Sequence, residues 1–138
     1  MKDMGYVDTL IAVAEDNPSP RGVVPSSRGE RKPIHVLQYE LLAASPHRYT
    51  HADLLIEVHV RHKGIFDTDR LDAIRGELLA KPHPCLRACL LPKKYGWGLH
   101  YDHHGRIALV DVASDEYRHL TGPDGGVAVV RAMRSSRT

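Results

Sequence analysis

The chain has 138 residues, of which 42% are hydrophobic and 26% are charged, and its formal net charge is +2 at pH 7. This composition excludes a strongly basic protein and a chain built around membrane spans, since the longest uncharged apolar run covers only residues 10–14 whereas a bilayer needs about 20. We therefore expect a single domain over residues 1–138, and a cytoplasmic location because no export signal is readable near the N-terminus.

The first third of the chain predicts a strand, a long loop and a helix. Residues 6–14 (YVDTLIAVA) are apolar and β-branched without a helical period, which is typical of a buried strand. Residues 15–33 contain four prolines and two glycines, and they predict a long irregular loop. Residues 34–44 (IHVLQYELLAA) have apolar residues at helical spacing and are soon followed by Pro46, so we expect a helix there.

The next two segments also predict helices. Thr50 and Asp53 have the spacing of a capping box, which favours a helix over residues 51–62. The apolar residues at 54, 56, 58 and 60 nevertheless alternate as they would in a strand. A third helix is expected after Asp67-Thr68 and before Pro82, with one apolar face formed by Leu71, Ile74 and Leu78.

From residue 85 onward the pattern changes to short strands. Turn residues separate three runs, which are CLRACLL at 85–91, YGWGLHY at 95–101 and RIALVDV at 106–112. Ser114 predicts the start of a helix and Gly122 its end, before a last strand at 127–133 and a basic tail at 134–138. The expected fold class is α+β, with a small antiparallel sheet that includes a 95–101/106–112 hairpin and packs on three or four helices.

A hairpin closed by Gly105 would give the sheet two unlike faces. With Gly105 in a left-handed conformation, the strand register pairs Tyr101 with Ile107, Leu99 with Leu109 and Trp97 with Asp111. Alternation then places Trp97, Leu99, Tyr101, Ile107 and Leu109 on one face, and Gly96, Gly98, His100, Ala108 and Val110 on the other. The nearly bare second face predicts the close approach of either a packed helix or a flat or phosphate-bearing ligand.

Basic residues gather around this hairpin. Residues 34–80 contain five basic and seven acidic residues, a net of −2, whereas residues 81–113 contain five basic and two acidic residues, a net of +3. Our leading hypothesis is a non-enzymatic module that binds an anionic partner, either a nucleic acid or a phosphate-bearing ligand. The candidate ligand-binding residues are Arg87, Lys93, Lys94, Gly96, Gly98 and His100.

The alternative hypothesis is a small thiol-dependent or metal-assisted enzyme that uses Cys85 as its nucleophile. Nearby cations would lower the pKa of this thiol, and His83 or His100 would serve as the base. The sequence can also be written H-x-C-x3-C-x10-H-x2-H, from His83 to His103. Two cysteines four residues apart on one strand would lie about 13 Å apart and could not bind one ion, so we expect no metal site and no cofactor.

The segment CLRACLLPKKYGWGLH at residues 85–100 fits the pattern CLRA-x-x-L-x-K-x-YGWG-x-H, and LQYELL at 37–42 and YTHADLL at 49–55 accompany it. With these segments the chain resembles a family of short bacterial proteins that carry a domain of unknown function. This chain has Asn17 and Cys89 where the family pattern has Cys and Ser, which argues against a shared cysteine-based metal site. The resemblance implies one fold unit, and it implies no reaction, substrate or cofactor.

Overall fold

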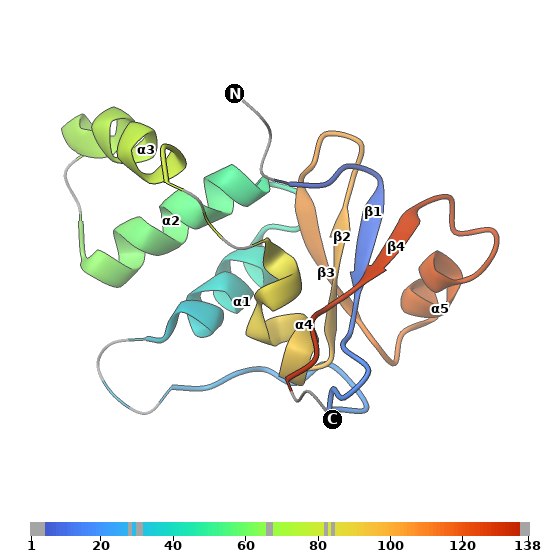
Figure 1. Ribbon diagram of the computed structural model, residues 1–138. Helices are drawn as coiled ribbons and strands as arrows, with labels where there is room; N and C mark the ends of the chain where they lie inside the picture. Colours follow the sequence, from blue (N-terminus) through green and yellow to red (C-terminus); the bar gives the residue numbers. More distant parts are fainter. Residues whose placement is uncertain are drawn as a thin grey trace.

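The structure is a computed structural model, and it describes residues 5–27, 29, 32–65, 68–81, 83 and 85–135. A four-stranded sheet in the order β3-β2-β1-β4 forms its centre, and its strands are β1 (Thr9–Ala12), β2 (Trp97–Tyr101), β3 (Ile107–Asp111) and β4 (Ala128–Arg131). Figure 1 shows α1, α2 and α4 on one side of this sheet and α5 on the other. The expected α+β fold is confirmed.

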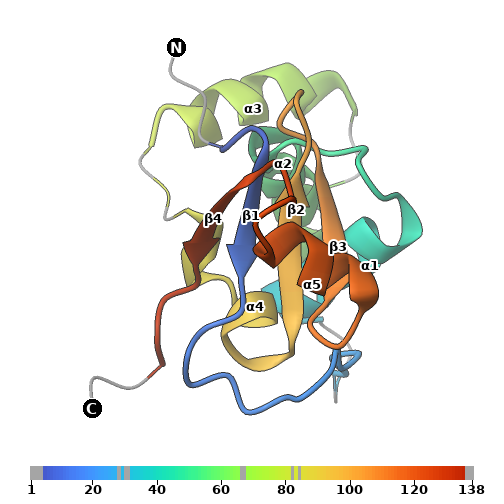
Figure 2. The same cartoon turned by 90° about the vertical axis from the view of Figure 1, so that its right-hand side faces the viewer.

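The sheet is mixed, so the prediction of a wholly antiparallel sheet was wrong. β1 and β2 are antiparallel, as are β2 and β3, but β4 runs parallel to β1 with Val129 opposite Leu10. β3 and β4 therefore point the same way, and the chain between them crosses the sheet through α5 (Asp115–Thr121), as Figure 2 shows. A connection of this kind makes β4 parallel to its neighbour, and the pattern of a single strand carries no signal for it.

The hairpin has the predicted register. Trp97 lies opposite Asp111, Leu99 opposite Leu109 and Tyr101 opposite Ile107. Gly105 closes the turn at φ +77°, a conformation that glycine adopts at little cost. The two predicted faces follow from this register, because successive side chains of a strand point to opposite sides.

The bulky face of the hairpin forms the main core. Leu99, Tyr101 and Ile107 are fully buried, and they pack with Ile11 of β1. The helices on this side contribute further buried side chains to the same cluster, namely Leu37, Leu41, Leu42, Leu54, Val58 and Leu91. Burial of a Leu or Ile side chain stabilises a fold by about 1.5–3 kcal/mol, so this cluster is the main apolar contribution to stability.

The first two of the four predicted helices begin and end within one residue of the expected positions. α1 spans Ile34–Ala44, and α2 spans His51–Lys63 behind the predicted capping box. In that box Thr50 Oγ1 accepts from the Asp53 backbone amide, while the Asp53 carboxylate accepts from the Thr50 amide. The cap explains why the segment is helical despite its strand-like alternation.

The apolar residues of α2 alternate along the sequence because two opposite sides of the helix are covered. Leu54 and Val58 belong to the core cluster, whereas Ile56 points away from them and is buried beside Arg75 of α3. α3 spans Leu71–Leu79 after a short 3-10 turn at Thr68–Arg70, and Ile74 is its buried residue. Asp67 and Pro82, which were expected to bound this helix, lie outside the described residues. Within the described ranges, no helix combines the length and apolar character that crossing a membrane requires.

The predicted strand at 85–91 was wrong. The chain instead forms a 3-10 turn, η2 (Leu86–Ala88), followed by a short helix, α4 (Leu90–Lys94). Pro92 is the third residue of α4, where the backbone amide has no partner within the helix, so a proline costs nothing there. Leu86 and Leu91 are both buried. In a strand these two side chains would point to opposite faces, because they are an odd number of residues apart.

The bare face of the hairpin is covered by α5, which Ser114 caps as predicted and Gly122 ends. A Cβ atom on Gly98 would lie 3.0 Å from the Tyr117 ring and 3.3 Å from the Ile11 carbonyl oxygen. The Tyr117 hydroxyl accepts from the Val13 amide at 3.0 Å, which fixes the ring over the glycine. A second buried cluster of Leu10, Val110 and Leu120 lies on this side. The helix-packing alternative therefore holds at Gly98, whereas the expectation that Gly96 shares this face was wrong, because Gly96 lies before β2 at φ +76° and faces Arg21.

This packing makes Gly98 sensitive to added volume. We expect Gly98→Val to lower the free energy of unfolding by about 1–3 kcal/mol, since the pinned Tyr117 ring and a backbone carbonyl leave no room for the side chain. Urea unfolding followed by Trp97 fluorescence measures this change. Gly76→Ala is the matched control: a methyl group at this position would have nothing within 4 Å of it, and an alanine in α3 should stabilise by about 0.5–1 kcal/mol. Equal effects of the two substitutions would contradict the packing argument.

Candidate functional site

The structure separates the six predicted ligand-binding residues into two groups. Gly96, Gly98 and His100 are covered by other parts of the chain, whereas Arg87, Lys93 and Lys94 lie near the surface on η2 and α4. The sequence predicted a single site because all six residues lie within a stretch of fourteen residues. In the fold, β2 turns away from the end of α4 and carries Gly98 and His100 into the sheet.

Gly96 is covered by the long loop that precedes α1. Its φ is +76°, and a Cβ atom there would lie only 2.2 Å from the Arg21 carbonyl oxygen. The loop is held in place by the Val23 amide, which donates to the Tyr95 carbonyl at 2.8 Å, and by the Trp97 indole, which donates to the Val23 carbonyl at 2.8 Å. The close approach expected at this glycine is therefore made by backbone of the same chain.

His100 lies in a different environment from the basic residues. Its Nδ1 is 2.9 Å from Nε2 of His47, which follows α1 and whose backbone amide donates to the Ile107 carbonyl. Burial, and then the neighbouring His47, lower the pKa of His100, although three carboxylates, those of Glu116, Asp102 and Asp8, oppose the shift. The pair is therefore held by a hydrogen bond that requires at least one unprotonated imidazole nitrogen.

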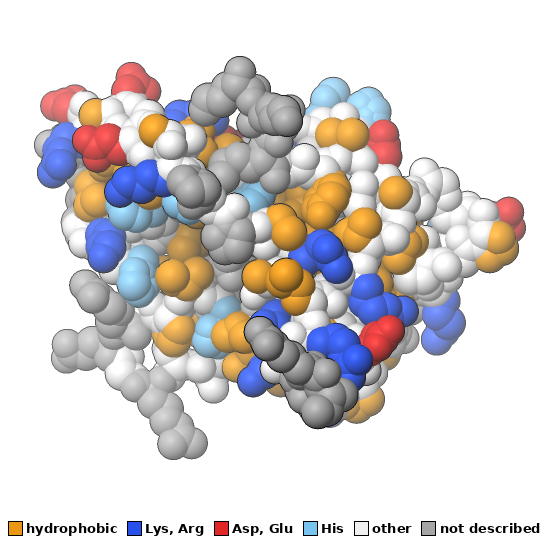
Figure 3. Space-filling view, viewed as in Figure 1, with side chains coloured by type: hydrophobic (Ala, Val, Ile, Leu, Met, Phe, Trp, Pro, Cys, Tyr) orange, Lys and Arg blue, Asp and Glu red, His pale blue; other side chains and the backbone are white. Residues whose placement is uncertain are grey.

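Arg87 contacts the backbone of Arg131 in β4, and the Arg131 guanidinium donates to the Val13 carbonyl at 3.1 Å. We call Arg87, Lys93, Lys94 and Arg131 the basic face. Arg87 Nε donates to the Arg131 carbonyl at 2.7 Å, and the Arg87 carbonyl accepts from the Met133 amide at 2.8 Å. Figure 3 shows Lys and Arg side chains gathered over α4 and β4 on this side of the molecule. The strand pairing that brings Arg131 here could not be read from the sequence.

Two acidic residues that follow β1 contact the start of the C-terminal tail. Glu15 lies 3.9 Å from Arg134, and the Asp16 carboxylate accepts from the Ser135 amide. Residues 136–138 of the predicted basic tail lie outside the described residues. In the described part of the chain, no ion pair involves any of the four residues of the basic face.

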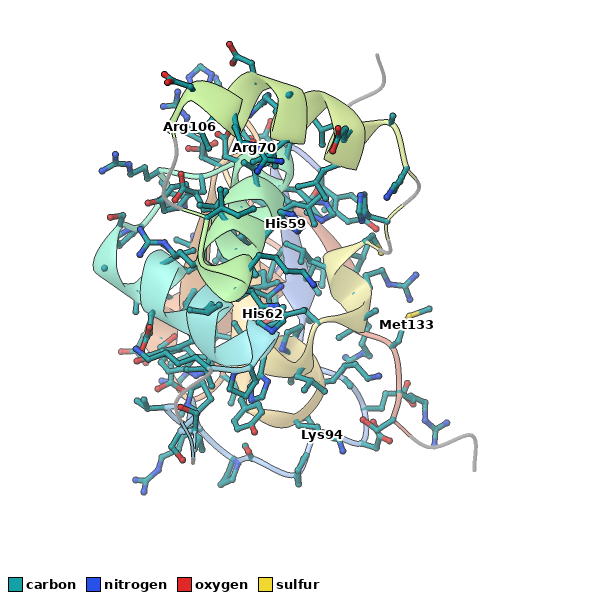
Figure 4. The ribbon with its side chains drawn as sticks, turned by 90° about the vertical axis from the view of Figure 1, so that its left-hand side faces the viewer. His59, His62, Arg70, Lys94, Arg106 and Met133 are labelled. Carbon is teal, nitrogen blue, oxygen red and sulfur yellow. The ribbon has the colours of Figure 1, made fainter. Side chains whose placement is uncertain are left out.

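A pocket of about 330 Å³ lies on the other side of the same segment, between α1, α2 and residues 83–90. Figure 4 views the molecule from this side, with α1 and α2 in front and η2 and α4 to their right. Cys85 and His83 both line the pocket, so the structure brings together two members of the alternative catalytic set. His100, paired with His47, is not among the residues that line it.

The two cysteines have different surroundings. Burial raises the pKa of the Cys89 thiol to about 12, and its Sγ donates to Gln38 Oε1 at 3.2 Å. Burial, and then the neighbouring Cys85, raise the pKa of Tyr6. The Tyr101 hydroxyl is buried without a hydrogen-bond partner among the described residues, and burial followed by the nearby Cys85 raises its pKa. Both cysteines line the pocket, but only Cys89 has a thiol whose pKa is strongly raised by burial.

The expected histidine and cysteine pattern does not converge on one point. Within the described residues, no group of three or more His, Cys, Asp or Glu side chains could hold a metal ion. His83 Nε2 lies 2.6 Å from the Leu78 carbonyl, while His103 lies in the hairpin turn, 3.8 Å from Asp8. His35 and His51 also line the pocket, and they were not predicted because burial of a histidine inside a helical segment leaves no mark in the sequence.

Comparison with known proteins gives one finding. The model of the family of unknown function DUF6157 matches residues 1–138, which agrees with the resemblance noted from the sequence. No curated protein and no solved structure matches the chain. The match assigns no reaction, ligand or partner, so function has to be argued from the geometry.

The different environments of the two cysteines predict selective alkylation. At about pH 8 we expect iodoacetamide to modify Cys85 in the folded protein and to leave Cys89 largely unmodified, because a thiol with a pKa of about 12 contains almost no thiolate at that pH. Peptide mass spectrometry against time measures both sites. Protein unfolded in guanidinium is the control, in which the two thiols should react alike. Similar rates in the folded state would show that the Cys89 environment is described wrongly.

The lowered pKa of His100 predicts a loss of stability in mild acid. Its folded-state pKa lies below the unfolded value of 6.5, so the unfolded chain binds the proton more readily and stability falls as pH drops below that value. We expect His100→Gln to reduce the difference in unfolding free energy between about pH 7 and pH 5, measured by urea unfolding at each pH. His119→Gln, an exposed histidine on α5, is the control and should leave the difference unchanged. An unchanged difference in His100→Gln would contradict the assignment.

Proposed function

We propose that this chain, which belongs to the family of unknown function DUF6157, is a non-enzymatic module that binds a nucleic acid or another phosphate-bearing partner on its basic face. The observation that supports this is the gathering of Arg87, Lys93, Lys94 and Arg131, none of which has an ion-pair partner in the described part of the chain. Unpaired cations on one surface attract polyanions and release the counterions of the phosphates.

Arg87 is the residue best prepared for such a contact. Its Nε is already bonded to the Arg131 carbonyl, which fixes the plane of the guanidinium group. The two terminal nitrogens then point as a pair, and a guanidinium fork matches two oxygens of one phosphate. A side chain held in this way loses less conformational entropy on binding than a free one.

The two lysines supply positive charge without the fixed orientation of the Arg87 guanidinium group. Lys93 and Lys94 form the last turn of α4, and the Lys94 carbonyl accepts from the Ser19 hydroxyl at 2.6 Å, which ties this end of the helix to the long loop. Lysine ammonium groups act as mobile point charges, so they suit a phosphate backbone better than one fixed ligand. This favours an extended polyanion over a small anion.

The proposal predicts that nucleic-acid binding weakens with added salt and depends on Lys93 and Lys94. With fluorescein-labelled single-stranded DNA or RNA at about 50 mM salt, Lys93→Gln/Lys94→Gln should bind about tenfold more weakly than the wild type. The slope of log affinity against log salt should become shallower by up to about 1.5, since each lost phosphate contact removes about 0.7 from it on single strands. Fluorescence anisotropy measures both quantities.

The matched control for charge is Lys63→Gln/Lys81→Gln, which removes the same charge from exposed positions outside the basic face. It should bind almost as the wild type does. If the wild type binds no DNA, RNA or nucleotide, or if added salt does not weaken binding, then the anionic-partner proposal is wrong. Equal losses in the two double variants would show that net charge, not the basic face, is responsible.

A thiol-dependent activity is the second candidate, and it is favoured by one observation. Cys85 and His83 line the same pocket. The rate of Cys85 alkylation against pH, together with elemental analysis for bound metal, tests this candidate. A thiol pKa of about 8.5 or above, in the absence of bound metal, would leave it without support.

A further inference from the structure

We propose that the pocket between α1, α2 and residues 83–90 binds a neutral, mostly aromatic or apolar small molecule that carries one carbonyl or hydroxyl group. Its volume is about 330 Å³. A cavity of about 150 Å³ is enough for benzene, so this pocket has room for a molecule of about two fused rings. Known small-molecule sites begin at about 300 Å³, and most of their lining is apolar.

The residues that line the pocket disfavour a charged ligand. The described residues around the pocket include no Lys, Arg, Asp or Glu, and its walls are formed largely by Ile34, Leu55, Leu86 and Leu90. Burying an ion without a partner costs far more than burying a neutral group, so a charged ligand would be excluded. His35 adds no charge at neutral pH, because burial lowers its pKa further. The ligand class of the pocket therefore differs from that of the basic face.

Two polar side chains in the lining have their hydrogen-bonding roles set by other contacts. His83 Nε2 lies 2.6 Å from the Leu78 carbonyl, and since a carbonyl only accepts, the neutral ring keeps Nδ1 as an acceptor. Gln38 Oε1 accepts from Cys89 Sγ at 3.2 Å, which leaves its amide NH2 group as a donor. One donor and one acceptor suit a single carbonyl or hydroxyl group on the ligand.

The pocket walls are held in place before any ligand binds. His35 stacks on Tyr95 with ring centroids 5.2 Å apart and planes inclined by 24°. His51 is 4% exposed and is the first residue of α2 behind the capping box. A preformed site avoids the entropy cost of ordering its walls on binding.

The test uses the full chain and prodan, a neutral naphthalene that carries a carbonyl group and brightens in apolar surroundings. We expect saturable binding at one site, and a rate of Cys85 alkylation by iodoacetamide that falls at least about fivefold when the site is occupied, since Cys85 lines the pocket. Added salt should not weaken binding, because no charge is involved. Peptide mass spectrometry follows the alkylation.

The blocking variant is Ala88→Phe, which places a ring at the pocket wall and should weaken prodan binding at least about tenfold. Ala113→Phe, at an exposed position before α5, is the matched control and should bind as the wild type does. Melting temperatures of both variants check that they are folded. The protection of Cys85 in the wild type remains as an independent measurement if Ala88→Phe fails to fold.

Three outcomes would overturn the proposal. The first is the absence of saturable prodan binding, the second is binding without protection of Cys85, and the third is unchanged binding in a folded Ala88→Phe variant. Lys93→Gln/Lys94→Gln should bind prodan normally. The proposal for the pocket and the proposal for the basic face can therefore be disproved independently of each other.

Discussion

The rest of the structure depends on the two-residue alternation along β2 and β3. Leu99 and Tyr101 point into the main core with Ile107, while Gly98, the residue before Leu99, leaves space on the opposite face. Three helices pack on the first face and α5 packs on the second, so one hairpin sets the spacing of both helical layers. A shift of register by one residue would turn His100 into the main core and Leu99 toward Tyr117 of α5, where only a glycine fits now.

The long loop before α1 links this hairpin to the candidate sites. The Gly22 amide donates to the Asp111 carboxylate at 2.8 Å, and the loop also bonds to the Tyr95 carbonyl and the Trp97 indole. It therefore closes the end of the hairpin where β2 leaves α4. Because the Ser19 hydroxyl bonds to the Lys94 carbonyl, the same loop fixes the helix end that carries the two lysines. A segment rich in proline can fill this role since it needs few backbone partners of its own.

Local signals in the sequence predicted most elements of the fold. The capping residues Thr50 and Ser114 placed the starts of α2 and α5, and Gly105 set the hairpin register, because each of these acts within a few residues. The prediction failed at residues 85–91, where two buried leucines and a proline fit a helical turn better than a strand. It also failed on the direction of β4, which depends on where α5 crosses the sheet. The first error is a local choice between helical turn and strand, whereas the second concerns contacts between distant parts of the chain.

The candidate sites were predictable only in part, for the same reason. The clustering of Arg87, Lys93 and Lys94 was visible as a local excess of charge, but Arg131 joins them through the pairing of β4 with β1. The pocket could not be predicted at all, since its walls come from α1, α2 and residues 83–90.

One short segment carries both proposed sites, and its backbone explains how they stay distinct. The 3-10 turn at Leu86–Ala88 ends at Cys89, whose φ and ψ of −67° and 139° are extended, before α4 begins. This break re-orients the chain so that Cys85, Ala88 and Leu90 line the pocket while Lys93 and Lys94 follow on the far turn. In a continuous strand, the pocket residues and the lysines would have been divided between opposite faces by alternation, and the segment would have formed no concave wall for the pocket. The change from strand to broken helix is therefore what allows an uncharged pocket and a cationic surface to lie within ten residues of sequence.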